Sequence, residues 1–63
     1  MNDFKTRLEN EKLELDEKII KLSLFLISPE YQKIDNVQQT LLNIQLPAME
    51  TYSQCLLERI VRL

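Results

Sequence analysis

The absence of glycine from all 63 residues is the feature that most restricts the folds open to this chain. Tight β-hairpins need residues with positive φ, and glycine supplies them at the lowest steric cost. Charged and straight-chain residues, which are good helix formers, dominate the first half of the sequence. The sequence therefore predicts an all-α fold, with residues 1–63 forming a single domain.

Pro29 marks the point where the predicted helical pattern breaks. A proline disfavours the helical conformation at the residue before it, so a first helix over residues 3–27 ends near Ser28. Ser28 could also cap a short turn that has Pro29 at its first position. Asp35 is a suitable cap for a second helix, with Gln38 three residues on. The prediction is a helix over 3–27, a connector over 28–35 and a helix over 36–62.

The predicted first helix has two apolar stripes when residues are placed at the α-helical step of about 100°. The first is typical of a core face and contains Phe4, Leu8, Leu15, Ile19, Leu22 and Leu26. The second lies roughly 140° around the helix and contains Leu13, Ile20, Leu24 and Ile27.

The predicted second helix also has two stripes. One contains Val37, Leu41, Ile44, Ala48, Tyr52 and Cys55. The other has coiled-coil-like spacing, is interrupted by Ser53, and contains Leu42, Leu46, Met49, Leu56, Ile60 and Leu63. Pro47, inside this helix, predicts a bend; the alternative is that the carbonyl freed at Asn43 is a binding feature.

An antiparallel hairpin uses only one stripe from each helix, so the surplus predicts a second chain. A chain this short has a marginal core, and Cys55 as the single cysteine excludes an internal disulfide. We therefore expect homodimers that form a four-helix bundle, although a higher homo-oligomer satisfies the same pattern. The expected interface residues are Leu42, Leu46, Met49, Leu56, Ile60, Leu13, Ile20 and Leu24.

The composition disfavours several classes of function. There is no histidine to serve as a general base or zinc ligand, and no glycine-rich phosphate loop, so neither an enzyme nor a cofactor is expected. Ten acidic residues against eight basic ones argue against nucleic-acid binding. No apolar run approaches the roughly 18 residues of a membrane span. The expected protein is cytosolic and acts by contacting other macromolecules.

A few side chains remain as candidates for a ligand site. Arg59 and Arg62 fit a helix C-terminus electrostatically, and could instead bind an anionic ligand together with Tyr52 or Tyr31. Tyr31 has the alternative of packing over the end of the hairpin. Cys55, on an apolar stripe, is expected to be a buried thiol; the alternative is a redox-sensing cysteine near a symmetric seam, which would need an exposed, acidic thiol.

Three segments of the chain resemble a group of very small phage proteins, encoded in the exo–xis region of lambda-like phages. The similar segments are Asp3-Phe4-Lys5-x-Arg7-Leu8-x-x-Glu11-Lys12-x-x-Leu15, Lys21-Leu22-x-x-Phe25-Leu26, and Gln39-x-Leu41-Leu42-x-x-Gln45-Leu46-x-Ala48-Met49-x-x-Tyr52. The resemblance implies a non-enzymatic accessory protein in the host bacterial cytoplasm.

The resemblance also implies a role. Such a protein would bind a host or phage protein and influence the lysis–lysogeny decision, prophage induction and host physiology. No catalytic residues come with the resemblance. The alternative hypothesis is an oligomeric sponge that binds a cyclic nucleotide immune signal, because some phage proteins with that role are short helical hairpins.

Overall fold

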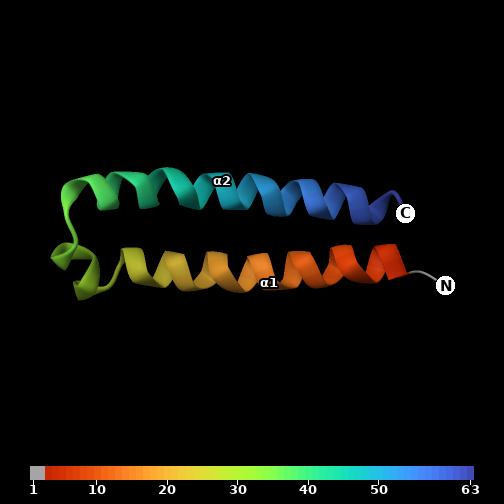
Figure 1. The fold of residues 1–63 in the computed structure, drawn as a ribbon, viewed down its shortest axis with the longest axis horizontal. Coiled ribbons are helices and arrows are strands. Elements are labelled where there is room, and N and C mark those ends of the chain that lie inside the picture. The colour runs from red at the N-terminus through yellow and green to blue at the C-terminus, as the bar shows by residue number, and fades with distance from the viewer. Residues whose placement is uncertain (1–2) are drawn as a thin grey trace.

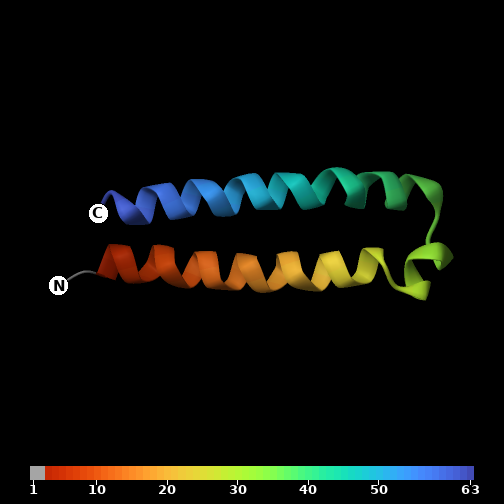
Figure 2. The ribbon, with the colours of Figure 1, turned by 180° about the vertical axis from the view of Figure 1, so that it is seen from behind.

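The computed structural model describes residues 3–63, which form two long helices joined by a short 3-10 helix (Figure 1). Helix α1 spans Asp3–Leu26, the 3-10 helix η1 spans Pro29–Lys33, and α2 spans Asn36–Val61. The two long helices lie side by side and antiparallel in both views (Figures 1 and 2), in a molecule of 48 × 15 × 13 Å. The predicted all-α hairpin is confirmed, and residues 3–63 contain no strand.

The end of α1 follows from Pro29, one residue earlier than the predicted end of the helix. Ser28 has extended backbone angles, φ −92° and ψ 159°, as expected before a proline. Its hydroxyl donates to the carbonyl oxygen of Phe25 at 2.6 Å and makes no cap bond to η1. Ser28 occupies the cap position of η1 with Pro29 in its first turn, as expected, while its side chain satisfies a carbonyl at the end of α1.

Tyr31 holds the connector against both long helices. Its ring meets that of Phe25 edge to face, with centroids 6.3 Å apart. Its backbone carbonyl accepts from Gln39 Nε2 at 2.9 Å, and its hydroxyl oxygen accepts from Asn43 Nδ2 at 2.7 Å. Tyr31 therefore packs over the end of the hairpin, which is one of the two alternatives drawn from the sequence.

Helix α2 begins at the predicted cap. The Asp35 carboxylate accepts from the backbone N–H of Gln38 at 2.9 Å, which satisfies one of the free amides of the first turn. The helix then continues through Pro47 without interruption. One turn later, the Thr51 hydroxyl donates to the Pro47 carbonyl at 3.0 Å.

The core is a single narrow seam between α1 and α2. Three leucines are buried in it, Leu8 and Leu15 from α1 and Leu56 from α2. Ile19, Met49 and Ile60 pack against them and are half-buried. Phe4, expected in the core, has 54% of its surface exposed and lies instead beneath the guanidinium of Arg59, at 6.0 Å. Within residues 3–63, neither helix has the length and apolar character needed to cross a membrane.

Candidate functional site

The expected interface residues of α2 lie on the face of this helix that packs on α1. Leu56 is completely buried there, and Met49 and Ile60 pack against the same core. Leu42 and Leu46 are half-buried. The coiled-coil-like spacing thus corresponds to a seam within one chain. Leu56 has no surface left for a second chain, so a subunit contact of this hairpin requires other residues.

The expected interface residues of α1 lie on the opposite side of their helix from the core. Leu13, Ile20 and Leu24 expose 60%, 59% and 60% of their surface, and Ile27 extends the same row at 83%. We call these four residues the α1 outer stripe. Charged residues of α1 border it, among them Glu17 and Lys21. Leu13, Ile20 and Leu24 are therefore accessible to a second chain, and their role in an interface stays a prediction.

The other stripe of α2 also faces away from the core. We call Val37, Leu41, Ile44, Ala48, Tyr52 and Cys55 the α2 outer stripe, and all six residues are exposed. The expectation of a buried Cys55 thiol is wrong for the single chain, because its stripe is not the one that α1 covers. Sequence spacing alone could not distinguish the two stripes, since both are apolar and both follow helical periodicity.

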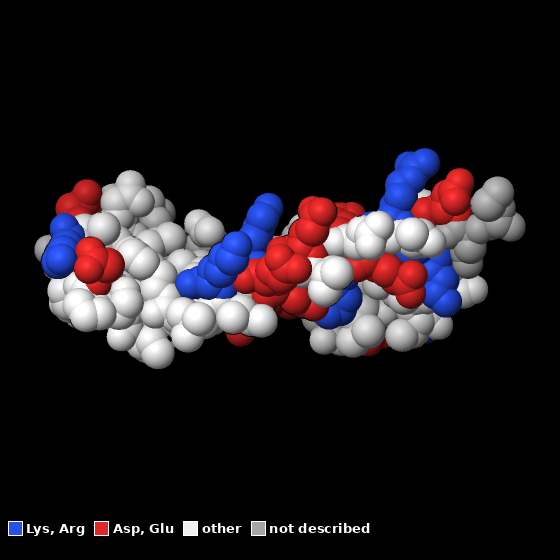
Figure 3. Space-filling view, turned by 90° about the horizontal axis from the view of Figure 1, so that it is seen from below, with Lys and Arg blue, Asp and Glu red and all other residues white. Residues whose placement is uncertain are grey.

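Charge is distributed unevenly along the hairpin. No acidic or basic residue occurs between Lys21 and Glu30, or between Asp35 and Glu50. Figure 3, which views the side formed by α1, shows charged side chains over the middle and at both ends of the molecule, and a largely uncharged surface between the middle and the connector end. The parts of α1 and α2 next to the connector therefore present apolar surface with few charges to keep it solvated.

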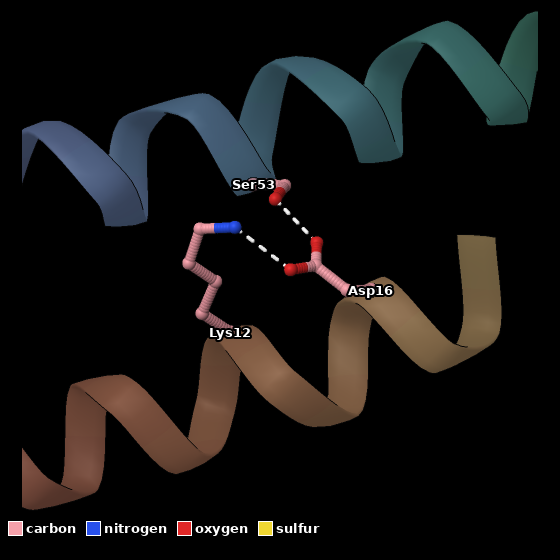
Figure 4. Close-up of polar contacts among 3 residues, drawn as sticks. All are labelled: Lys12, Asp16 and Ser53. Carbon is pink, nitrogen blue, oxygen red and sulfur yellow. Dashed lines mark hydrogen bonds and ion pairs between the residues drawn. The ribbon is translucent and has the colours of Figure 1, made fainter. Parts of the chain in front are cut away.

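A polar cluster joins the two helices across the core seam (Figure 4). The Ser53 hydroxyl donates to one carboxylate oxygen of Asp16 at 2.5 Å, and Lys12 Nζ lies 2.7 Å from the other. Hydrogen bonds from Lys12 and then Ser53 lower the pKa of Asp16 below its usual range. Ser53 is the residue that interrupts the apolar seam, and it places its hydroxyl where α1 offers an acceptor.

This cluster is not suited to nucleophilic catalysis. A carboxylate with a lowered pKa is a weak base, and Lys12 already neutralises it, so Asp16 cannot readily take the Ser53 proton. Residues 3–63 also form no pocket and contain no group of three acidic or cysteine side chains placed to hold a metal ion. The cluster instead fixes how α1 and α2 pair, because its two partners are 37 residues apart in the sequence.

The four candidate ligand residues do not all meet in one chain. Tyr31 lies at the connector, whereas Arg59 and Arg62 lie at the far end of α2. Arg59 stacks over Phe4, and Arg62 pairs with Glu58 at 3.4 Å on the surface. Tyr52 is 45% exposed on the α2 outer stripe, on the same helix as the two arginines. A ligand that needs both tyrosines and both arginines would therefore require more than one copy of the chain.

Comparison with known proteins places the chain in a family. No curated protein matches the sequence, and no solved structure matches the fold. The family model for Sequestin matches residues 2–62, which is nearly the whole chain. The chain therefore belongs to the Sequestin family.

Proposed function

We propose that this chain is a non-enzymatic sequestering protein, which binds another molecule and holds it away from its normal target. The observation that carries the proposal is its exposed apolar surface. Among the described residues, twelve large hydrophobic side chains are exposed and only three are buried. Contiguous apolar surface of this kind marks sites of association. The family name, Sequestin, is consistent with this activity.

The first candidate target is a host or phage protein. The α1 outer stripe has the spacing that suits the apolar face of a partner helix, with Ile20, Leu24 and Ile27 as neighbouring anchors. Following the resemblance to the exo–xis proteins, binding in the bacterial cytoplasm would remove a host or phage factor from the lysis–lysogeny decision. The phage role and the location rest on that resemblance alone.

The first candidate is tested by prophage induction in cells that carry or lack the gene. Leu24→Glu places a charge in the α1 outer stripe and should abolish the effect of the gene while the protein stays helical. Lys18→Glu changes an exposed charge of the same helix outside the stripe and should leave the effect intact. Unchanged induction on loss of the gene, or equal behaviour of the two variants, would overturn this candidate.

The second candidate target is a cyclic nucleotide immune signal. The supporting observation is that Tyr52, Arg59 and Arg62 are exposed on one helix, where arginine and an aromatic ring could bind phosphate and base. Cyclic dinucleotides and trinucleotides would be titrated by calorimetry. Arg59→Ala and Arg62→Ala should weaken binding about tenfold or more, which is about 1.4 kcal/mol, whereas Lys18→Ala should not.

The two candidates are separable in a single experiment. A cyclic nucleotide should raise the melting temperature of the purified protein, because a ligand bound only to the folded state stabilises it. A flat response across the panel rejects the second candidate and leaves the first untouched. Conversely, Leu24→Glu should retain nucleotide binding if the arginines alone hold the ligand.

A further inference from the structure

The α2 outer stripe is an uncharged helix face made of six exposed residues. At about 100° per residue its six members fall within an arc of about 80°. Val37, Leu41 and Ile44 expose 68%, 51% and 60% of their surface. The one charged residue between Asp35 and Glu58 is Glu50, which lies about 160° around the helix from the centre of the stripe. None of the six residues of the stripe is charged.

The hairpin exposes more surface than a compact monomer of its mass, and the excess is about the area that one subunit buries in an interface. The chain exposes 4922 Å². A compact monomer of the same mass, 7.5 kDa, would expose about 4,250 Å². The surplus of about 670 Å² is close to the roughly 800 Å² that each partner buries in a stable protein interface. One copy packed on one outer stripe would remove an area of this order.

Charge at the two ends of the stripe favours one orientation of such a copy. The C-terminal end carries Arg59 and Arg62 against Glu58, and is net positive. The connector end carries Glu30 and Asp35 against Lys33, and is net negative. Antiparallel helices bring the positive end of one copy to the negative end of the other. Parallel helices would place each end beside its own like charges.

We propose that a second copy of this chain packs antiparallel on the α2 outer stripe, about a two-fold axis at Ala48. The stripe is nearly symmetric about this residue, which is small enough to let two helices approach closely. Ile44 then meets the partner's Tyr52, and Leu41 meets the partner's Cys55. Such a contact is self-complementary, as a two-fold interface must be. The proposal concerns assembly only and holds whichever target is sequestered.

The α1 outer stripe remains accessible in this assembly. On helical wheels, the two outer stripes turn away from the shared core in opposite senses, and therefore lie on opposite sides of the hairpin. Glu17 and Lys21 beside the α1 outer stripe also make that face less suited to a dry contact between copies. The pair of hairpins would thus present two α1 outer stripes for a target.

The first test uses disulfide cross-linking to show which positions of the two copies lie close together. Leu41→Cys is made with the native Cys55 present, and the protein is oxidised under dilute conditions. Positions 41 and 55 of one chain are about 21 Å apart along the helix at about 1.5 Å per residue, too far for a bond, which needs Cα atoms within about 7 Å. We expect covalent dimers linked from position 41 to the partner's Cys55, identified by peptide mass.

Matched controls make the result decisive. The unmodified chain and the double variant Leu41→Cys, Cys55→Ser should both form no covalent dimer after oxidation. Covalent dimers of the unmodified chain through Cys55 would instead indicate parallel helices and overturn the proposed orientation. The absence of covalent dimers from Leu41→Cys would overturn the proposed interface.

The second test measures mass by light scattering. It compares two variants whose substituted side chains are equally exposed in the single chain. Ile44 and Leu13 both expose 60% of their surface in the single chain, so a glutamate at either position should be tolerated by the fold. Ile44→Glu should reduce the mass to that of the monomer, 7.5 kDa. Leu13→Glu should keep the doubled mass. A monomeric unmodified protein, or dissociation by Leu13→Glu alone, would refute the proposal.

Discussion

Replacing Leu56 with alanine tests whether the seam between α1 and α2 is the true core. Leu56 is the only large side chain of the described residues with no exposed surface, and it touches the leucines of α1. A Leu→Ala change at such a site costs about 2–5 kcal/mol, from lost burial and from the cavity that remains. A chain of this length has about 3–9 kcal/mol of total stability, from roughly 0.05–0.15 kcal/mol per residue. Leu56→Ala should therefore remove a large share of it.

Leu57→Ala is the matched control for this prediction. The two positions are adjacent on the same helix, so both substitutions change helix propensity by the same amount. Leu57 is 39% exposed, and its removal leaves a notch open to water instead of a closed cavity. We expect a loss of about 1 kcal/mol for Leu57→Ala, which is smaller by about 2 kcal/mol than the loss for Leu56→Ala.

The assay is urea unfolding followed by far-ultraviolet circular dichroism. Both variants are measured at the same protein concentration, and again at a higher one, because association makes the midpoint depend on concentration. The midpoint of Leu56→Ala should lie well below that of Leu57→Ala at each concentration. Coincident midpoints would show that Leu56 is not specially buried, and the assignment of the intramolecular seam would be refuted.

Three further predictions follow from local contacts. Because the pKa of Asp16 is lowered on folding, its ionised form stabilises the fold above the usual value of 3.8, and this contribution disappears as pH falls through the lowered pKa. Lys12→Met should raise the pKa of Asp16 toward 3.8, measured by carboxyl NMR; an unchanged pKa would contradict the assigned cause. Asp35→Ala should cost about 1 kcal/mol in thermal unfolding, whereas Asp35→Asn should cost only a few tenths, since asparagine also caps helices. Pro47→Ala should raise stability, by up to about 3 kcal/mol, because alanine restores a backbone donor inside α2; a decrease would mean that the proline has a packing role.

The helix boundaries were predictable because single residues determine them. Pro29 forces the backbone to be extended at Ser28, and Asp35 supplies the oxygen that caps Gln38. These are interactions between neighbours in the sequence, and their chemistry does not depend on what the rest of the chain does. The predicted ends of both long helices accordingly lie within one residue of those observed.

The choice of the inward face of α2 was not predictable in the same way. Both of its stripes are apolar, and the more regular one predicts a contact between chains. Ser53 interrupts that stripe in the sequence, yet it is buried, and its hydroxyl donates a hydrogen bond to Asp16 on the other helix. A bond between residues this far apart leaves no periodic signal. The bond between Ser53 and Asp16 identifies the face of α2 that packs on α1. Leu56 lies on that face and is buried, whereas Cys55 lies on the other stripe and is exposed.

The connector decides which molecule Leu56 packs against. If the bend at Ser28 and Pro29 were straightened, α1 and α2 would separate, and α2 could pair with α1 of another chain through the same seam, as a domain-swapped dimer. Pro29 opposes a continuous helix at this point, and Tyr31 ties the bend to Gln39 and Asn43. These few contacts at one end of the hairpin therefore favour pairing of α1 and α2 within one chain over the domain-swapped dimer. The apolar core would be the same in both forms.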